Sequence, residues 1–155
     1  MTPAVETLQN LKLPFVLHQF DNQVEHDYAR HAADYLGIAH ERVFKTLICQ
    51  GADKALLVAI VPATHNLNMK LLARSADQKK VEMAEQKVAQ ARTGYLKGAI
   101  SPIGQKLQLP TYLDRRATAH PQIFVSGGRR GLEIEITPTA LVAATNATIA
   151  ALTPD

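Results

Sequence analysis

Lys45 is the residue whose type and position most directly suggest chemistry. It stands in the apolar run 43–48, where strand alternation would place it on the same face as Leu47 and Cys49. An ammonium group on an apolar face costs free energy unless it is paired or faces a cavity, where it could hold a phosphate or polarise a ligand. An edge strand whose lysine reaches water along its aliphatic stem fits the same pattern equally well. The residues alone leave both interpretations open.

Two glycine-rich segments are the next candidates. Gly98 and Pro102 lie four residues apart in a loop that has few large side chains and several free backbone amides. Amides arranged in this way can hold an ester carbonyl or the oxyanion that develops from it. Ser126-Gly127-Gly128 offers a second place where a ligand could approach the backbone closely. Each segment taken alone is also typical of an ordinary turn.

The spacing patterns of common catalytic and metal sites are absent from the sequence. There is no GxSxG elbow, Walker phosphate loop, HExxH or GxGxxG motif. The histidines are scattered, and His26 and His31 are too far apart for a helical ligand pair, so we expect no metal and no cofactor. Cys49 ends an apolar run and is best explained as a small buried residue. Ser101 and Ser126 could act as nucleophiles, but neither has an identifiable base partner.

The composition is typical of one soluble globular domain, which we assign to residues 1–155. The chain has 46% hydrophobic and 20% charged residues and is long enough to bury a core. It contains no apolar run of the roughly 18 to 20 residues needed to span a bilayer. Residues 1–6 lack the features of a secretory signal, and the single cysteine excludes an internal disulfide. We therefore expect a cytoplasmic protein that is not associated with a membrane.

Three basic doublets account for part of the net charge of +3: Lys79-Lys80, Arg115-Arg116 and Arg129-Arg130. Gathered on one face, they could follow a phosphate backbone without reading bases. Solvated surface is the alternative explanation for each doublet. Aromatic residues make up only 5% of the chain and include no tryptophan, which argues against a base-stacking platform. If RNA is the partner, it would dock by charge while one small terminal group is recognised.

The elements that must position these residues can be outlined from the hydrophobic pattern. Helices are predicted after Thr2-Pro3, over 28–36, from Asn68 through residue 72, over 84–91 and from Thr137-Pro138 onward. Strands are predicted over 15–20, 42–49, 55–61, 123–126 and 132–136, and the last two enclose a glycine-rich hairpin turn. Helices and strands mix without regular βαβ alternation. The prediction is therefore a single α+β domain with a mixed sheet that curls into a barrel-like form surrounded by helices.

Several segments taken together resemble the YbaK/EbsC family of aminoacyl-tRNA deacylases, which is related to the editing domain inserted in some prolyl-tRNA synthetases. The segments occur in the family's order: Phe44-Lys45-Thr46-Leu47, Lys80–Ala84, Thr93–Leu96, Gly98–Lys106 and Val125–Leu132. The resemblance extends over nearly the whole chain and is weakest in the last helix. It implies a compact α+β fold around a mixed β-barrel, with no metal.

The resemblance also implies roles for particular residues. Lys45 matches a lysine that engages the terminal adenosine or phosphate of the tRNA. The loop Gly98-Ala99-Ile100-Ser101-Pro102 matches a GxxxP segment that holds the aminoacyl carbonyl, with Gly98 and Ser101 expected closest to the reaction. Ser126 and Gly127 match a turn that lines the same pocket, and Glu133 falls where an acidic residue is common. Phe20 stands where relatives often carry tyrosine, so a hydroxyl contact would be missing there.

The chemistry implied by the resemblance is trans-editing of Cys-tRNA(Pro), with Cys-tRNA(Cys) as a further substrate. The substrate's own thiol would attack its ester carbonyl, which explains why no protein nucleophile is apparent. The protein would orient the ester and stabilise the oxyanion. Partners would be the aminoacylated 3′ end of tRNA and prolyl-tRNA synthetase. The alternatives are water attack on another small ester such as Ala-tRNA(Pro), and a non-catalytic module that binds tRNA or nucleotides.

Overall fold

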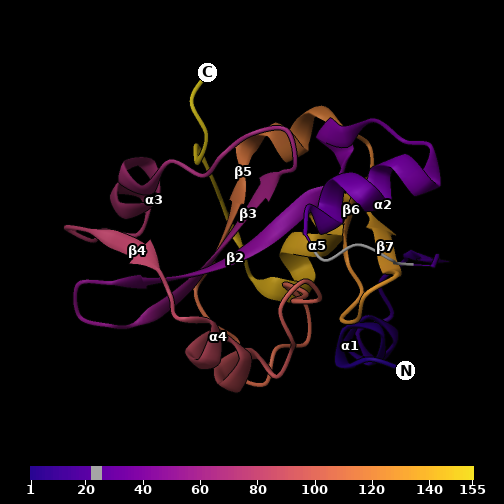
Figure 1. Cartoon of the computed structure of the whole chain (residues 1–155), viewed down its shortest axis with the longest axis horizontal. Coiled ribbons are helices and arrows are strands. Elements are labelled where there is room, and N and C mark those ends of the chain that lie inside the picture. The colour runs from indigo at the N-terminus through magenta and orange to yellow at the C-terminus, as the bar shows by residue number, and fades with distance from the viewer. Residues whose placement is uncertain (22–25) are drawn as a thin grey trace.

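The computed structural model describes residues 1–21 and 26–155, and within these ranges the strands form two sheets. The larger sheet has the strand order β4-β2-β3-β5-β8 and contains both parallel and antiparallel pairs. Its strands are β2 (Phe44–Gly51), β3 (Leu56–Pro62), β4 (Val81–Met83), β5 (Thr111–Asp114) and β8 (Thr148–Ala150). Figure 1 shows β2 crossing the centre of the molecule.

The smaller sheet is antiparallel, with the order β1-β7-β6. Its strands are β1 (Val16–Gln19), β6 (Ile123–Ser126) and β7 (Leu132–Ile136). The predicted hairpin is therefore confirmed as β6–β7, and β1 joins it from the other end of the chain. Glu133 of β7 lies opposite both His18 of β1 and Ser126 of β6, so the three side chains share one face of the sheet.

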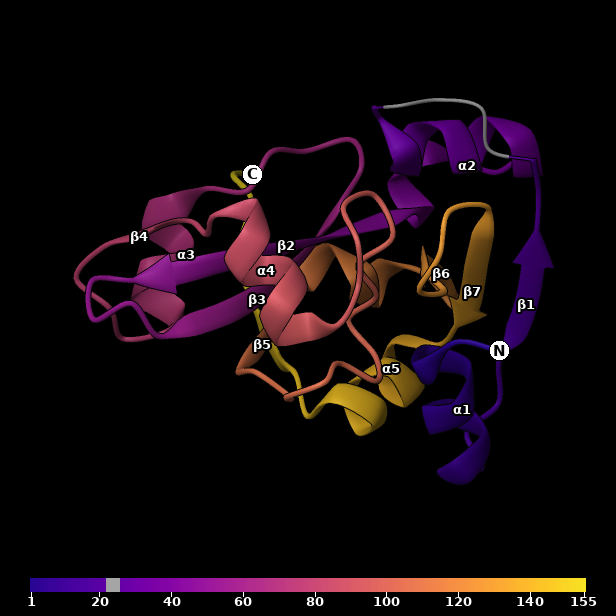
Figure 2. The same ribbon diagram turned by 60° about the horizontal axis from the view of Figure 1, so that its bottom comes forward.

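Helices pack around both sheets. In the described ranges they are α1 (Pro3–Asn10), α2 (Tyr28–Leu36), α3 (Met69–Ser75), α4 (Gln86–Thr93), α5 (Pro138–Thr145) and the 3-10 helices η1 (His40–Arg42) and η2 (Arg115–Ala119). The predicted caps are present at Asn68 and Thr137, whose side-chain oxygens accept backbone N–H groups of the first turns, and Thr2 caps α1 in the same way. Figure 2 shows α2 beside the smaller sheet and α4 over the middle of the larger sheet.

The α+β class is confirmed, but the strands do not close into a barrel. β6 approaches the start of β2 through one isolated parallel bridge, between Val43 and Phe124. Farther along the same edge, β4 pairs with β2 only over Cys49–Gly51. The same edge of β2 thus contacts β6 at its start and β4 at its end. The two sheets therefore meet at a corner. The expectation of a barrel-like sheet is corrected to two joined sheets.

The main core fills the space between the two sheets. It includes Phe44 and Ile60 of the larger sheet, Ile134 of the smaller sheet and Leu141 of α5. A second cluster lies on the other side of β2 and β3, where α3 covers it. Every residue of β3 is buried, as predicted for a continuous apolar strand. Among the described helices, none has both the length and the apolar character required to cross a bilayer.

Candidate functional site

A cavity of about 550 Å³ lies at the corner where the two sheets meet. Its walls come from the start of α2, the middle of β2, the segment from β4 to α4, the loop after α4 and the β6–β7 hairpin. A concavity of this size suits a small ligand or the end of a larger one. Because the five segments are distant in sequence, only the fold brings the wall residues together.

The cavity follows residues 45–47 of β2, which pair with β3 on one side and with no described strand on the other; we call this other side the open edge. The C=O of Ile48 accepts the N–H of Ala84, 3.0 Å away, and therefore points toward the β4 side. Strand alternation turns the main-chain N–H and C=O of Thr46 to the same side, where no described strand pairs with them. Oγ1 of Thr46 is also shielded from solvent without a hydrogen-bond partner in the described structure. The open edge can therefore accept and donate hydrogen bonds to a ligand.

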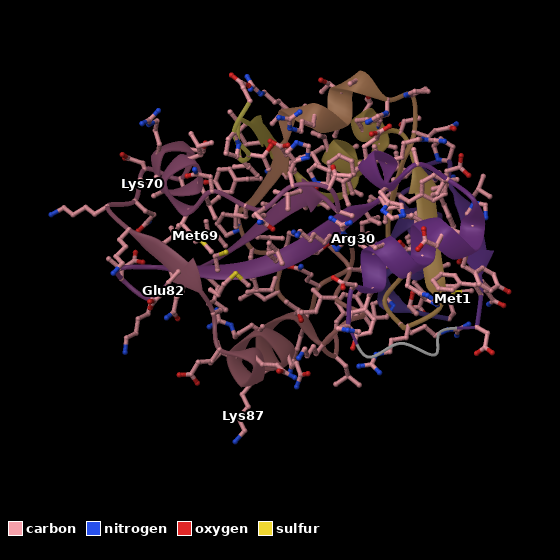
Figure 3. All side chains as sticks on the ribbon, turned by 45° about the horizontal axis from the view of Figure 1, so that its top comes forward. Met1, Arg30, Met69, Lys70, Glu82 and Lys87 are labelled. Carbon is pink, nitrogen blue, oxygen red and sulfur yellow. The ribbon has the colours of Figure 1, made fainter. Side chains whose placement is uncertain are left out.

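Lys45 lines this cavity from the open edge and is half-buried. Its burial lowers the pKa of the ammonium group, Arg30 lowers it further, and Asp27 acts in the opposite direction. Figure 3 shows Arg30 on α2 beside the start of β2. Of the two interpretations that the sequence left open, the structure supports a lysine that faces a cavity.

The loop after α4 forms the opposite wall. Gly98 and Ile100 line the cavity, and Gly98 has a left-handed φ of 79°. A Cβ at Gly98 would lie 2.5 Å from the ring of Tyr28, so glycine is required both by the backbone and by this contact. The hydroxyl of Tyr95 donates to the C=O of Ile103 over 2.6 Å and holds the loop against the core.

Three other residues of the same loop do not reach the cavity. Ala99, Ser101 and Pro102 are buried outside its walls. The Ser101 hydroxyl accepts the N–H of Ile103 at 3.2 Å, and the Ser101 C=O accepts the side-chain N–H of Gln105 at 3.1 Å. In this structure Ser101 thus lies away from the cavity and its bonds shape the turn, so its predicted place at the reacting group gains no support from the geometry.

The β6–β7 hairpin contributes Ser126 and Glu133 to the cavity. Glu133 is only 7% exposed, and burial raises the pKa of its carboxyl group to about 8. Gly127 lies outside the walls, with its N–H donating to the C=O of Leu132. Phe20 reaches the cavity next to this hairpin because its N–H donates to the C=O of Gly131.

Contacts between Tyr28 and Arg130 join α2 to the hairpin and were not predicted from the sequence. The Arg130 guanidinium donates to the Tyr28 hydroxyl at 2.7 Å and lies 4.8 Å from the centre of its ring. Arg130 also donates to the C=O of Lys97 at 3.5 Å. The two residues are far apart in sequence, and the only available signal was the basic doublet inside a glycine-rich turn.

Of the three basic doublets, only Arg129-Arg130 lines the cavity. Arg116 donates instead to Thr153 and Pro154, and Arg115 pairs with Asp155. The Arg115-Arg116 pair therefore does not join Arg129-Arg130 at this cavity. The mouth of the cavity is still rich in cations, since Arg30 and Lys97 also line it.

Neither Cys49 nor a cluster of metal-ligating side chains lines the cavity in the described residues. Cys49 lies outside the cavity walls, and burial raises the pKa of its thiol to about 11, so the reactive thiolate is disfavoured. Its sulfur lies 3.9 Å from that of Met83. In residues 1–21 and 26–155, no group of three or more histidine, cysteine, aspartate or glutamate side chains is placed to hold a metal ion.

Comparison with known proteins relates this chain to tRNA editing proteins. Residues 25–144 match the family described as the aminoacyl-tRNA editing domain. A curated relative from Enterococcus faecalis is 40% identical over 152 residues, which cover 98% of this chain and 93% of the relative. Its name describes it as a candidate Cys-tRNA(Pro)/Cys-tRNA(Cys) deacylase, EbsC.

Two solved structures share the fold. The structure of a hypothetical protein has a TM-score of 0.88 at 24% identity and covers 98% of this chain and 99% of its own. That of a candidate trans-editing enzyme for prolyl-tRNA synthetase has a TM-score of 0.83 at 22% identity, with coverage of 100% and 99%. At these identities the likeness concerns the fold alone.

Proposed function

The chain belongs to the aminoacyl-tRNA editing domain family, and from this premise we propose that it is a trans-editing deacylase that removes cysteine wrongly attached to proline tRNA. The observation that carries the proposal is that Lys45, Gly98 and Ser126 line one cavity with a cationic mouth. Cys-tRNA(Cys) is included as a second substrate because the Enterococcus relative is named for both esters.

The cavity can accept the 3′ end of a tRNA by charge. Lys45 holds the terminal phosphate or adenosine at the open edge of β2, while the cations at the mouth attract the preceding phosphates. This charge contact carries no sequence information. Selection of proline tRNA is therefore assigned to an association with prolyl-tRNA synthetase, in keeping with the solved trans-editing relative. Use of aminoacyl-tRNA places the proposed activity in the cytoplasm.

The substrate supplies its own nucleophile in the proposed reaction. The cysteine sulfur attacks the ester carbonyl carbon, and the bond to the ribose oxygen breaks as a cyclic thiolactone forms. The thiol proton is lost and the ribose oxygen gains one, so no water is consumed until the thiolactone opens to cysteine. The loop at Gly98 and Ile100 orients the carbonyl and stabilises the oxyanion, and a thiol ionises readily enough near neutral pH to need no strong base.

Single-turnover incubation with charged tRNAs tests this function. Wild-type protein should release cysteine from Cys-tRNA(Pro), and the rate should rise when prolyl-tRNA synthetase is present. Ala-tRNA(Pro) and Cys-tRNA(Cys) measure how far the specificity extends. A non-catalytic binding module would instead protect the ester from spontaneous hydrolysis, and that result would contradict the proposal.

A further inference from the structure

Glu133 is a buried acid for which the described residues supply no partner. It is 7% exposed and lines the cavity, yet no hydrogen bond or ion pair reaches its carboxyl group from residues 1–21 or 26–155. Burial raises the pKa of this carboxyl group, in keeping with its lack of a charged partner among the described residues. An uncompensated buried carboxyl group costs free energy, so its position in a cavity wall calls for an explanation.

The other acidic side chain of β7 is partnered. Glu135, two residues along β7, lies 2.9 Å from Nε2 of His18. Cations line the same cavity, but in the described residues no ion pair joins any of them to Glu133: Arg130 bonds to Tyr28, and the charges that act on Lys45 are those of Arg30 and Asp27. The ligand is therefore the candidate source of a cation for Glu133.

The end of an aminoacyl-tRNA contains one such cation. Its phosphates are anionic, its sugar and its bases are uncharged at neutral pH, and its α-amino group is protonated with a pKa of about 7.7–8.0 in a free chain end. A carboxyl group with a raised pKa and an α-amino group hold one proton between them. When that proton is on the nitrogen, the two groups form an ion pair, and no proton is exchanged with the solvent. Such a charge-assisted contact is stronger than a neutral hydrogen bond.

We propose, resting on the proposed function, that Glu133 receives the α-ammonium group of the aminoacyl ester and limits the cavity to esters with a free α-amino group. Lys45 on the open edge and Glu133 on the hairpin then hold opposite charges of the same ligand, with the carbonyl directed to the Gly98 loop. Esters whose nitrogen is acylated, as in peptidyl-tRNA, carry no such cation and are rejected. The cavity thereby removes a misattached amino acid but spares a growing chain.

The test compares two esters on proline tRNA. Cysteinyl-tRNA carries the α-amino group, whereas 3-mercaptopropionyl-tRNA keeps the thiol and the ester but lacks that group. The ratio of kcat/KM for the two esters is measured for wild type, for Glu133→Gln and for the matched control Glu135→Gln. The folded fraction cancels within each ratio, because both esters are measured on the same protein. The difference in intrinsic reactivity between the two esters is common to all proteins and cancels when their ratios are compared.

Glu133→Gln should lower the preference for the cysteinyl ester by about tenfold or more, the size of a hydrogen bond between charged groups. Glu135→Gln should leave the preference unchanged, and Glu133→Asp should restore part of it. An equal loss on both esters in Glu133→Gln would overturn the inference and leave a structural role for this acid. If wild-type protein releases no cysteine from Cys-tRNA(Pro), the proposed function itself fails, which is a different result.

Discussion

Two buried carboxyl groups, Asp114 and Glu133, have opposite surroundings. Asp114 is fully buried at the end of β5, where it accepts the N–H of Leu152 and the hydroxyl of Thr153, each at 2.9 Å. Arg116 lies 3.8 Å from the same carboxylate. Glu133 is buried to a similar degree and faces a cavity, but it has no such partner in the part of the chain that the structure describes. The comparison indicates that Asp114 stabilises the fold, whereas Glu133 is retained at a cost in stability for a ligand.

The largest expected effect is on the Asp114 side of the comparison. Asp114→Ala removes the acceptor of two hydrogen bonds and leaves Arg116 without its buried counter-charge. The free energy of unfolding should fall by about 3–5 kcal/mol. Denaturant unfolding measures this loss, and activity per folded molecule should stay close to wild type. A mild loss of stability would break the contrast between the two acids.

In contrast to Asp114, ionised Glu133 should lower the stability of the fold, and its effect should depend on pH. Its pKa rises from the usual 4.5 to about 8 on folding, so the folded protein binds the proton more tightly than the unfolded chain. The stabilisation is full below pH 4.5 and is lost as the pH rises through about 8. Between pH 5 and pH 8, the free energy of unfolding of wild type should fall by about 3 kcal/mol more than that of Glu133→Gln. Identical pH dependence in the two proteins would show that this acid is already compensated.

In the proposed complex, Glu133 is the anionic contact of the ligand and Lys45 is the cationic one. Lys45→Ala should remain folded and lower deacylation roughly a hundredfold, the loss expected for a contact between charged groups. Lys87 is the matched control, because it is exposed on α4 and its side chain points away from the molecule in Figure 3. Lys87→Ala should be as active as wild type. Normal turnover by folded Lys45→Ala would remove this residue from the site.

A smaller effect is expected at Gly98. Gly98→Ala adds a left-handed backbone penalty of about 1 kcal/mol and forces the methyl group into the Tyr28 ring. Gly37→Ala is a matched control, since Gly37 has a similar φ of 68° and nothing within 4 Å of the added carbon. Both variants should lose stability through the left-handed backbone, Gly98→Ala more so because of the Tyr28 contact, but only Gly98→Ala should lose activity per folded molecule, by about tenfold. Equal activities would assign the Gly98 contact to folding alone.

The sequence predicts the elements with strong periodicity and proper caps. The buried β3, the β6–β7 hairpin and the helix after Thr137-Pro138 are all present near their predicted bounds. The three-residue strands β4 and β8 were missed because so short a segment shows no alternation. The barrel was overpredicted because no local pattern reveals that one edge of β2 is divided between β4 and β6.

The candidate site was predictable where a residue conflicts with its local pattern. Lys45 interrupts an apolar strand and Gly98 stands in a loop of small residues, and both line the cavity. The contact between Tyr28 and Arg130 joins residues 102 positions apart, which no local signal encodes. Ser101 shows the opposite case, since its loop was identified but its inward turn toward Ile103 depends on packing.

The most direct test of the central claim compares cysteinyl and seryl esters on proline tRNA, using wild type and Cys49→Ala. If the substrate thiol opens the ester, wild type should cleave the cysteinyl ester far faster than the seryl ester and release a thiolactone that can be trapped. Cys49→Ala should retain this activity, because burial holds Cys49 outside the cavity as a thiol. Equal rates for the two esters, with activity lost in Cys49→Ala, would contradict the account in favour of a protein nucleophile.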